Sequence, residues 1–320
     1  MFDPILVPLD GSLLAECVLP HVVALGRAFN AKITLVHVLD KDRAGASAQL
    51  FDLINWQINK TEAKLYLERI GDRLQEAGLQ TKAIVLEGMV AESITEYAQS
   101  QQMNLVILSS HGHSGPRKWG ISSVTQKIIL SAPTSVLITR AHQPAVSETT
   151  EHPYRRILLP LDGSQRAENP LPLISVLARF HKSLIQIAHV VKTPEMPRYM
   201  SLVQEDIDLS NRVVARNREE ALHYLDQVRL SSPLAGVTGP THLLTSDNAA
   251  ATLHELVKQE RIDLVVLSAH GYSGNNQWPY GAMVNNFILY GKVPLLVVQD
   301  LPAKEESHQV DMTVREHAKH

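Results

Sequence analysis

The sequence of 320 residues contains a single cysteine, Cys17, so no disulfide can form within the chain. One thiol among apolar neighbours is typical of a buried residue in a protein from a reducing compartment. No apolar run reaches the roughly 18 residues that a membrane-spanning helix needs, and neither a basic flank nor a cleavage-like site follows Met1. We therefore expect a cytoplasmic protein that does not cross a membrane.

A surplus of basic residues is also missing. The chain has 30 lysines and arginines against 33 aspartates and glutamates, for a net charge of -3. Proteins that bind nucleic acid or anionic membranes through charge usually carry a basic surplus. We therefore expect neither nucleic acid nor a membrane surface as a partner. The hydrophobic content of 44% is that of an ordinary globular protein.

Three common glycine motifs are absent as well. The sequence contains no G-x-G-x-x-G, no G-x-x-x-x-G-K-[ST] and no G-x-S-x-G. Their absence argues against the usual dinucleotide-binding, P-loop and α/β-hydrolase sites. No loop offers a paired general base and nucleophile either, so we expect a binding or regulatory protein with at most slow hydrolysis of a bound ligand.

The chain does contain a long internal repeat. Residues 105–125, LVILSSHGHSGPRKWGISSVT, return as residues 264–285, LVVLSAHGYSGNNQWPYGAMVN, at an offset of 159. Nearer the start, ILVPLDGS returns as ILLPLDGS at an offset of 152. A repeat of this kind means two copies of one unit, and the chain length suits two domains of about 150 residues each.

The copies set the expected domain boundaries. We predict domains at 1–140 and 154–300, a polar linker at 141–153, and a polar C-terminal tail at 301–320. The growth of the offset from 152 to 159 predicts seven extra residues in the second copy, which we place in the loop around 194–209.

Short apolar runs alternate with helical patterns through each copy. In the first copy the strands are expected at 5–9, 32–38, 84–87, 105–108 and 136–139. A helix is expected from about Leu13 to Phe29, and Pro20 should bend or open it. Strands that alternate with helices favour a parallel sheet covered on both faces, which is an open doubly wound α/β domain.

Asp10 and the glycine loop after Leu108 both follow strands, so they belong to the same edge of that sheet. Ligands of open α/β sheets bind beyond the carboxyl ends of the strands. Glycines let backbone N–H groups approach an anion, and a following helix N-terminus adds a positive dipole end. The sequence therefore indicates a phosphate-binding edge, although glycine loops also occur as simple tight turns.

The order of LVPLDGS, LVHV, LVILSSHGHSG and PTSVLIT resembles the universal stress protein family, and its repetition resembles the tandem form of that family. The resemblance implies two Rossmann-like domains of the adenine nucleotide alpha hydrolase type. Each would be an open five-stranded parallel sheet of order 3-2-1-4-5 with helices on both faces. The last strands of the two copies would pair about a pseudo-twofold axis. Some members bind ATP through G-x2-G-x9-G-[ST], and others lack that motif and do not.

Both copies carry imperfect versions of this motif. In the first copy its positions are Ser109, Gly112, Ser122 and Ser123, and in the second they are Ser268, Gly271, Gly281 and Ala282. Serine at a position that needs positive φ would cost on the order of 1 kcal/mol, which a bound triphosphate could offset. The first copy keeps hydroxyls at Ser123 and Thr125 and places Arg117 and Lys118 in the loop, where they could neutralise phosphate charge. Gly115 and Val124 are further candidate binding residues of this loop and helix start. We therefore expect the better site in the first copy.

The resemblance also implies that Asp10 contacts the ribose and Val38 the adenine, with Asp162 and Val190 as their equivalents in the second copy. Simpler roles stay open for all of them. The aspartates could cap the first helices, and the valines could pack in the core.

Histidines at the same edge raise the question of a metal site. His111, His113 and His270 are the candidates, but no cysteine or carboxylate accompanies them at ligand spacing, so we expect structural or surface roles. His37 and His189 fall within strands, where a hydrogen-bonded imidazole in the core is the expected role.

These observations predict a stress-response protein that binds ATP or a related adenine nucleotide, with or without Mg²⁺, as a conformational or interaction switch. The alternative is a nucleotide-independent module with degenerate loops that acts through protein partners. An adenylating enzyme would need an H-x-G-H or S-G-G-x-D-S loop, which is absent. A monomer and a homodimer of such chains are both compatible with the sequence.

Overall fold

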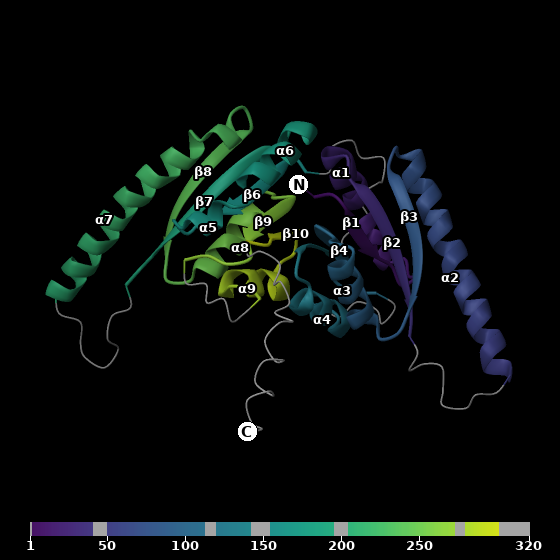
Figure 1. Ribbon diagram of the computed structural model, residues 1–320. Coiled ribbons are helices and arrows are strands. Elements are labelled where there is room, and N and C mark those ends of the chain that lie inside the picture. Colours follow the sequence, from purple (N-terminus) through teal and green to yellow (C-terminus); the bar gives the residue numbers. More distant parts are fainter. Residues whose placement is uncertain are drawn as a thin grey trace, which may run out of the picture.

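The computed structural model describes residues 2–40, 50–112, 120–141, 154–194, 204–272 and 279–300. The predicted linker, apart from Ala141, and the predicted tail lie outside these ranges, as do Gly115, Arg117, Lys118 and His113. Strands and helices alternate along both copies, and the strands lie side by side in one continuous sheet (Figure 1).

The order of the strands confirms the predicted topology. The ten-stranded sheet runs β3-β2-β1-β4-β5-β10-β9-β6-β7-β8, so each copy has the order 3-2-1-4-5 and the second copy is reversed relative to the first. Within each copy the neighbouring strands are parallel, whereas β5 and β10 pair antiparallel. In the first copy the strands are β1 (Ile5–Pro8), β2 (Lys32–Leu39), β3 (Gln80–Glu87), β4 (Leu105–Ser109) and β5 (Ser135–Thr139). In the second they are β6 (Arg156–Pro160), β7 (Leu184–Lys192), β8 (Thr238–Ser246), β9 (Leu264–Ser268) and β10 (Leu295–Val298).

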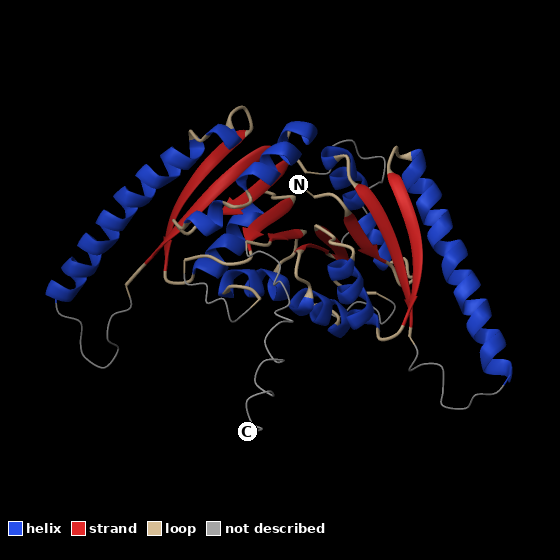
Figure 2. Ribbon diagram, viewed as in Figure 1, coloured by secondary structure: helices blue, strands red, loops and turns tan. Residues whose placement is uncertain are grey.

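Helices cover both faces of the sheet (Figure 2). One face carries η1 (Ala15–Val18), α1 (Leu19–Phe29), α2 (Leu50–Glu76), α5 (Gln165–Glu168), α6 (Leu171–His181), α7 (Gln204–Arg229) and η3 (Ser232–Leu234). The other carries α3 (Val90–Ser100), α4 (Ser123–Ser131), α8 (Ala249–Gln259) and α9 (Ala282–Tyr290). Strand side chains alternate between the two faces, so each face has its own core: Leu35 packs on the α1 and α2 side, and Val36 on the α3 and α4 side. Both cores run through residues of both copies.

On the face that carries α4 and α9, each copy donates side-chain hydrogen bonds to the last turn of a helix in the other copy. The buried Arg140 donates to the carbonyl oxygens of Phe287 (2.7 Å) and Ile288 (3.0 Å) in the last turn of α9. In return Tyr280 donates its hydroxyl to the carbonyl oxygen of Ile129 in the last turn of α4 (3.0 Å). A donor at a helix C-terminus satisfies carbonyl groups that have no partner within the helix. Burial lowers the pKa of Arg140 to about 10, which still leaves the guanidinium charged at neutral pH.

On the opposite face α1 packs against α6 across the same pseudo-twofold axis. The imidazole Nδ1 of His21 lies 2.7 Å from the hydroxyl of Tyr154, and Nε2 of His181 lies 3.1 Å from the carbonyl oxygen of Ala24. All three side chains are buried. The junction therefore contains polar groups that are hydrogen-bonded across the copies.

Differences from the predicted elements are at their ends. A 3₁₀ turn precedes α1, and Pro20 lies in the first turn of α1, where its missing N–H leaves no hydrogen bond unmade. The predicted loop around 194–209 is wrong in its second part, because α7 already begins at Gln204. None of the described helices has the length and apolar character needed to cross a membrane.

Candidate functional site

The first part of the site is the turn after β1. Gly11 has a φ of +81°, which favours glycine, and it turns the chain so that Asp10 faces Ser12. The Asp10 carboxylate accepts from the Ser12 N–H (3.0 Å) and the Ser12 hydroxyl (2.6 Å). The Ser12 oxygen in turn accepts from the Ala15 N–H at 3.1 Å. The serine therefore holds the start of η1, and Asp10 orients that serine.

Gly112 lies against this carboxylate. A Cβ atom added to Gly112 would be 2.0 Å from Oδ2 of Asp10, which is far closer than non-bonded atoms approach. The glycine is therefore needed for close approach of the two segments. It fixes the distance between the ends of β1 and β4, which the sequence placed at the same edge.

Ser109 ends β4 beneath this loop. Its hydroxyl donates to the carbonyl oxygen of His111 (2.6 Å), with the carbonyl oxygen of Leu14 at 3.1 Å. Cys17 lies below it, with Sγ 3.4 Å from the Ser109 hydroxyl and 3.2 Å from the hydroxyl of Thr139. Burial raises the pKa of the Cys17 thiol, so the thiol is a packed neutral group, as predicted.

Helix α4 begins at the site with a side-chain cap. Ser122 is the N-cap residue, and its oxygen accepts from the Thr125 N–H at 3.1 Å. The Thr125 hydroxyl lies 2.8 Å from the Ser122 hydroxyl and donates to the Ser109 carbonyl oxygen (3.0 Å), which ties α4 to β4. Ser122 has a φ of -65°, so the expected backbone strain at this motif position is wrong. An N-cap has extended backbone, which serine adopts readily.

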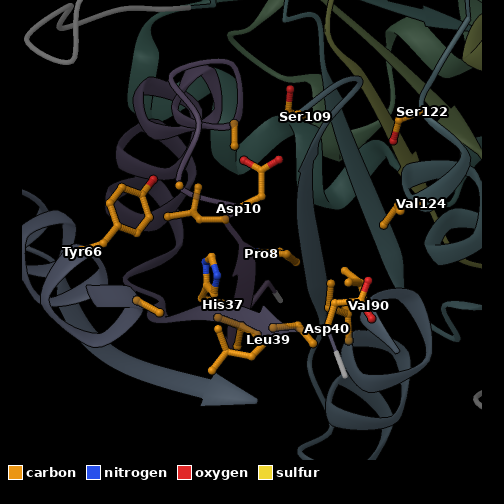
Figure 3. A pocket seen from close by; sticks show the side chains of 18 of the residues that line it. Pro8, Asp10, His37, Leu39, Asp40, Tyr66, Val90, Ser109, Ser122 and Val124 are labelled. Atoms are coloured by element: carbon orange, nitrogen blue, oxygen red, sulfur yellow. The ribbon is translucent and has the colours of Figure 1, made fainter. Parts of the chain in front are cut away.

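These segments surround a cavity of about 900 Å³ in the first copy. Seven of the predicted site residues line it, namely Asp10, Val38, Ser109, Gly112, Ser122, Val124 and Thr125. Ser123 is not among the lining residues, although it opens α4. Figure 3 shows Tyr66 on one side of Asp10 and His37, and Val90 and Val124 on the opposite side. The volume is near the upper end of the range of about 300–1,000 Å³ that is usual for small-molecule sites.

The lining includes residues that the sequence did not assign to the binding site. Those with polar or aromatic side chains are His37, Asp40, Asn55, Trp56, Asn59, Glu62 and Tyr66. Five of them lie on α2, at spacings that place them on one helical face. That spacing was readable in the sequence, but only the packing of α2 against β2 shows that this face borders the site.

Burial shifts the pKa of two of these side chains. Desolvation lowers the pKa of His37, with the Leu9 carbonyl and the Asp10 charge as smaller opposing influences, so the imidazole is neutral at physiological pH. Desolvation and the adjacent Glu16 raise the pKa of Tyr66, whose hydroxyl donates to Glu16 (3.4 Å). Glu16 is also paired with Arg73 at 3.0 Å. The Tyr66 side chain is therefore held in place by Glu16, and its uncharged ring lines the cavity.

The second copy repeats the turn. Asp162 accepts from the Ser164 N–H (3.0 Å) and hydroxyl (2.6 Å), and also from the Tyr272 N–H (2.6 Å). Ser164 is the N-cap residue of α5, so a capping role for Asp162 itself is wrong. A Cβ on Gly271 would be 2.1 Å from Oδ2 of Asp162. The pairing of aspartate and glycine is therefore a property of both copies.

The remaining motif positions of the second copy differ from the first. Gly281 is the N-cap of α9 with a φ of -68° and makes no side-chain cap, and Ala282 begins the helix. The Ser268 hydroxyl is buried and makes no hydrogen bond within the described residues. Val190 and Val38 are half-buried and pack against the core on the α4 and α9 side. The hydroxyl network around α4 has no counterpart among these residues of the second copy.

His111 and His270 are buried at this edge, His189 is half-buried, and each of the three has a hydrogen-bond partner. His111 Nδ1 lies 3.2 Å from the Ser110 hydroxyl, and His270 Nδ1 lies 2.8 Å from Asp300, whose other oxygen is 3.9 Å from Arg166. His189 Nδ1 lies 2.9 Å from the Leu161 carbonyl oxygen. Within the described ranges, no three histidine, cysteine or acidic side chains are grouped as a metal ion would require.

Comparison with known proteins identifies both copies. The model of the universal stress protein family matches residues 1–140 and again 153–299. A universal stress protein of Methanocaldococcus jannaschii is 28% identical over 155 residues, which are 44% of this chain and 96% of that protein. A universal stress protein of Bacillus subtilis is 27% identical over 149 residues, covering 44% of this chain and all of that protein.

Solved structures cover nearly the whole chain. A universal stress protein from Archaeoglobus fulgidus matches 93% of this chain and 99% of its own, with a TM-score of 0.63 and 15% identity. A structure from Pseudomonas aeruginosa matches 93% of each chain, with a TM-score of 0.65 and 14% identity. At this identity the likeness concerns the fold alone. With both halves matched by the family model, the chain belongs to the universal stress protein family and carries two of its domains in tandem.

Proposed function

We propose that the first copy binds ATP or a related adenine nucleotide, and that the bound nucleotide sets the conformation or the partners of the protein in a stress response. The observation that carries this proposal is the cavity of about 900 Å³ at the carboxyl edge of β1, β2 and β4. Asp10, Val38, Gly112 and the start of α4 all border this cavity.

The groups around the cavity suit the parts of a nucleotide. The exposed Asp10 carboxylate accepts hydrogen bonds from ribose hydroxyls, and the apolar surface at Val38 packs on the base. Gly112 offers backbone without a side chain, and the first turn of α4 directs N–H groups and a positive dipole end toward phosphate. A Mg²⁺ ion, where present, would neutralise phosphate charge.

One observation favours the alternative of a nucleotide-independent module. The hydroxyls of Ser122 and Thr125 are bonded to each other, to the Thr125 N–H and to the Ser109 carbonyl. They therefore already have partners without a phosphate. In that case these hydrogen bonds would only connect α4 to β4, and the protein would act by binding protein partners.

Mass spectrometry of nucleotide released from freshly purified protein, followed by calorimetric titration of ATP with magnesium, separates the two proposals. Loss of the Asp10 hydrogen bond to ribose should weaken ATP binding about 10- to 100-fold in Asp10→Ala. Asp162→Ala removes the same turn from the second copy and should leave that affinity unchanged. A wild-type protein that carries no nucleotide and binds none at roughly millimolar ATP would overturn the proposal.

A further inference from the structure

The cavity of the first copy has two sides, because it wraps around the end of β2. Successive side chains of a strand point to opposite faces of the sheet. Val36 and Val38 face α3 and α4, whereas His37 and Leu39 face α2, and all four line the same cavity. In Figure 3, Tyr66 lies on one side of Asp10 and Val124 on the other. We use "apolar arm" for the side lined by Val36, Val38, Val90, Ile94, Val124 and Ile128, and "α2 arm" for the side lined by His37, Leu39, Asn55, Trp56, Asn59, Glu62, Ala63 and Tyr66.

The proposed nucleotide occupies the apolar arm and the loop. Its base lies at Val38 and its phosphates at the start of α4, both of which belong to the α4 side of the sheet. The α2 arm faces the other way and takes no part in that arrangement. It is the part of the same cavity that the proposed nucleotide leaves empty.

Trp56 forms the main surface of the α2 arm. Its ring is half-buried and belongs to neither of the two cores, although it is among the largest side chains of the chain. A tryptophan that borders a cavity without packing in a core offers a flat apolar face for stacking. On the same helical face, Asn55 and Asn59 add carboxamides and Glu62 adds a carboxylate. Within the described residues these four side chains make no hydrogen bond to the rest of the protein.

The charges of the α2 arm disfavour an anion. The described lining residues include no lysine or arginine, whereas Glu62 and Asp10 are carboxylates. His37 is neutral there because burial lowers its pKa. Carboxylates and amide oxygens accept from exocyclic amino groups, and asparagine can pair two atoms of a base edge at once. The chemistry therefore fits a neutral planar ring that carries N–H donors.

The second copy keeps part of this surface and lacks the rest. Ala63 and Tyr66 correspond to Ala221 and Tyr224, because each alanine is buried and each tyrosine donates to a glutamate, Glu16 or Glu168. The offset of 158 places Val213 and Val214 at the positions of Asn55 and Trp56. At the same offset Asn217 and Glu220 occupy the positions of Asn59 and Glu62, whereas the positions of Asn55 and Trp56 differ. Helix α7 thus forms with two valines at the positions that Asn55 and Trp56 occupy on α2. The tryptophan and the asparagine are not required by the architecture.

We propose that the α2 arm binds the ring of a nucleobase that carries an exocyclic amino group, as a second, phosphate-free subsite beside the nucleotide. Trp56 stacks on the ring, and Asn55, Asn59 and Glu62 bind its polar edge. This inference depends on the proposed function only for the position of ATP in the other arm.

The test is a calorimetric titration of adenosine, guanosine, cytidine and uridine into the protein saturated with ATP. The three nucleosides with an amino group should bind, and uridine should bind several-fold more weakly. Trp56→Val, which copies the second copy, should weaken nucleoside binding about tenfold or more through loss of stacking, with ATP affinity unchanged. Ile58→Val is the matched control, because Ile58 lies on α2, is 48% exposed and is not among the lining residues.

Two results would overturn the inference. One is the absence of nucleoside binding by the wild-type protein. The other is competition between nucleosides and ATP, or an equal loss of both in Trp56→Val, which would mean a single site. If the protein binds no ATP but binds nucleosides through Trp56, the proposed function fails and the subsite stands.

Discussion

At the scale of single residues, the turn and the loop at the site pack together because each copy has a glycine where a side chain would clash. Gly112 and Gly271 each lie where a Cβ would be about 2 Å from an aspartate oxygen of the same copy. Each aspartate is already held by a serine two residues later, so it cannot move aside without losing those hydrogen bonds. The turn after the first strand and the loop after the fourth strand of each copy therefore pack closely only while this position is glycine.

Replacement of Gly112 by alanine tests this pairing. Gly112→Ala should displace the Asp10 carboxylate, lower the free energy of unfolding by about 1–2 kcal/mol and weaken ATP binding at least about tenfold. The matched variant Gly271→Ala makes the same clash with Asp162 and should cost similar stability without changing ATP affinity. Urea denaturation and calorimetry measure the two effects. Equal ATP affinity in both variants would show that the pairing does not shape the nucleotide site.

At the scale of elements, α4 has only nine residues, so its first turn is a large part of it. Ser122 supplies the cap, and Thr125 ties that turn to the end of β4. Short helices are marginal by themselves and gain their stability from caps and packing. The cap therefore also determines where the N–H groups of the first turn point.

Removal of the cap has a defined cost. Ser122→Ala should lower the free energy of unfolding by about 1 kcal/mol, because the Thr125 N–H loses its acceptor. Ser123→Ala removes an exposed hydroxyl one residue later, for which no hydrogen bond is seen in the described structure, and should change stability little. The urea midpoints of the two variants give the comparison. A similar loss in both would contradict the role of Ser122 as cap.

Much of this architecture could be predicted from the sequence, because strands β1, β2, β4 and β5 are short apolar runs between turn signals, and the repeat shows each of them twice. The strain expected at Ser122 was wrong, since a motif position does not reveal the backbone angle at which it is used. The wall formed by α2 was missed for a different reason. Trp56 and Asn59 follow a helical spacing that is equally compatible with a solvent-exposed face, and only tertiary packing places them at the cavity.

At the scale of the whole molecule, the junction between the copies contains a buried imidazole. His21 is hydrogen-bonded to Tyr154 of the other copy, and burial lowers its pKa from 6.5 to about 4. Between these two pH values the unfolded chain binds a proton that the folded chain does not. Stability is therefore unaffected above pH 6.5 and decreases as the pH falls from 6.5 toward 4.

This linkage predicts a slope of up to about 1.4 kcal/mol per pH unit from His21 alone. In His21→Gln, which keeps a polar side chain near Tyr154, the decrease in stability between pH 6.5 and 4 should be smaller by about 3 kcal/mol. His223→Gln provides the control for loss of an imidazole at the surface, because His223 is exposed and lies away from the junction on α7. Urea denaturation at a series of pH values measures both. Identical pH profiles for His21→Gln and wild type would contradict the assignment.

The antiparallel pairing of β5 with β10 joins the two copies into one sheet within a single chain. In an assembly of two identical subunits every substitution is inherited by both halves at once, so neither half can change alone. Here one mutation changes one half only. Asn55 and Trp56 correspond by sequence offset to Val213 and Val214, which is a difference between the halves of this kind. A tandem chain can therefore keep the shared sheet while the surface of one half changes independently of the other.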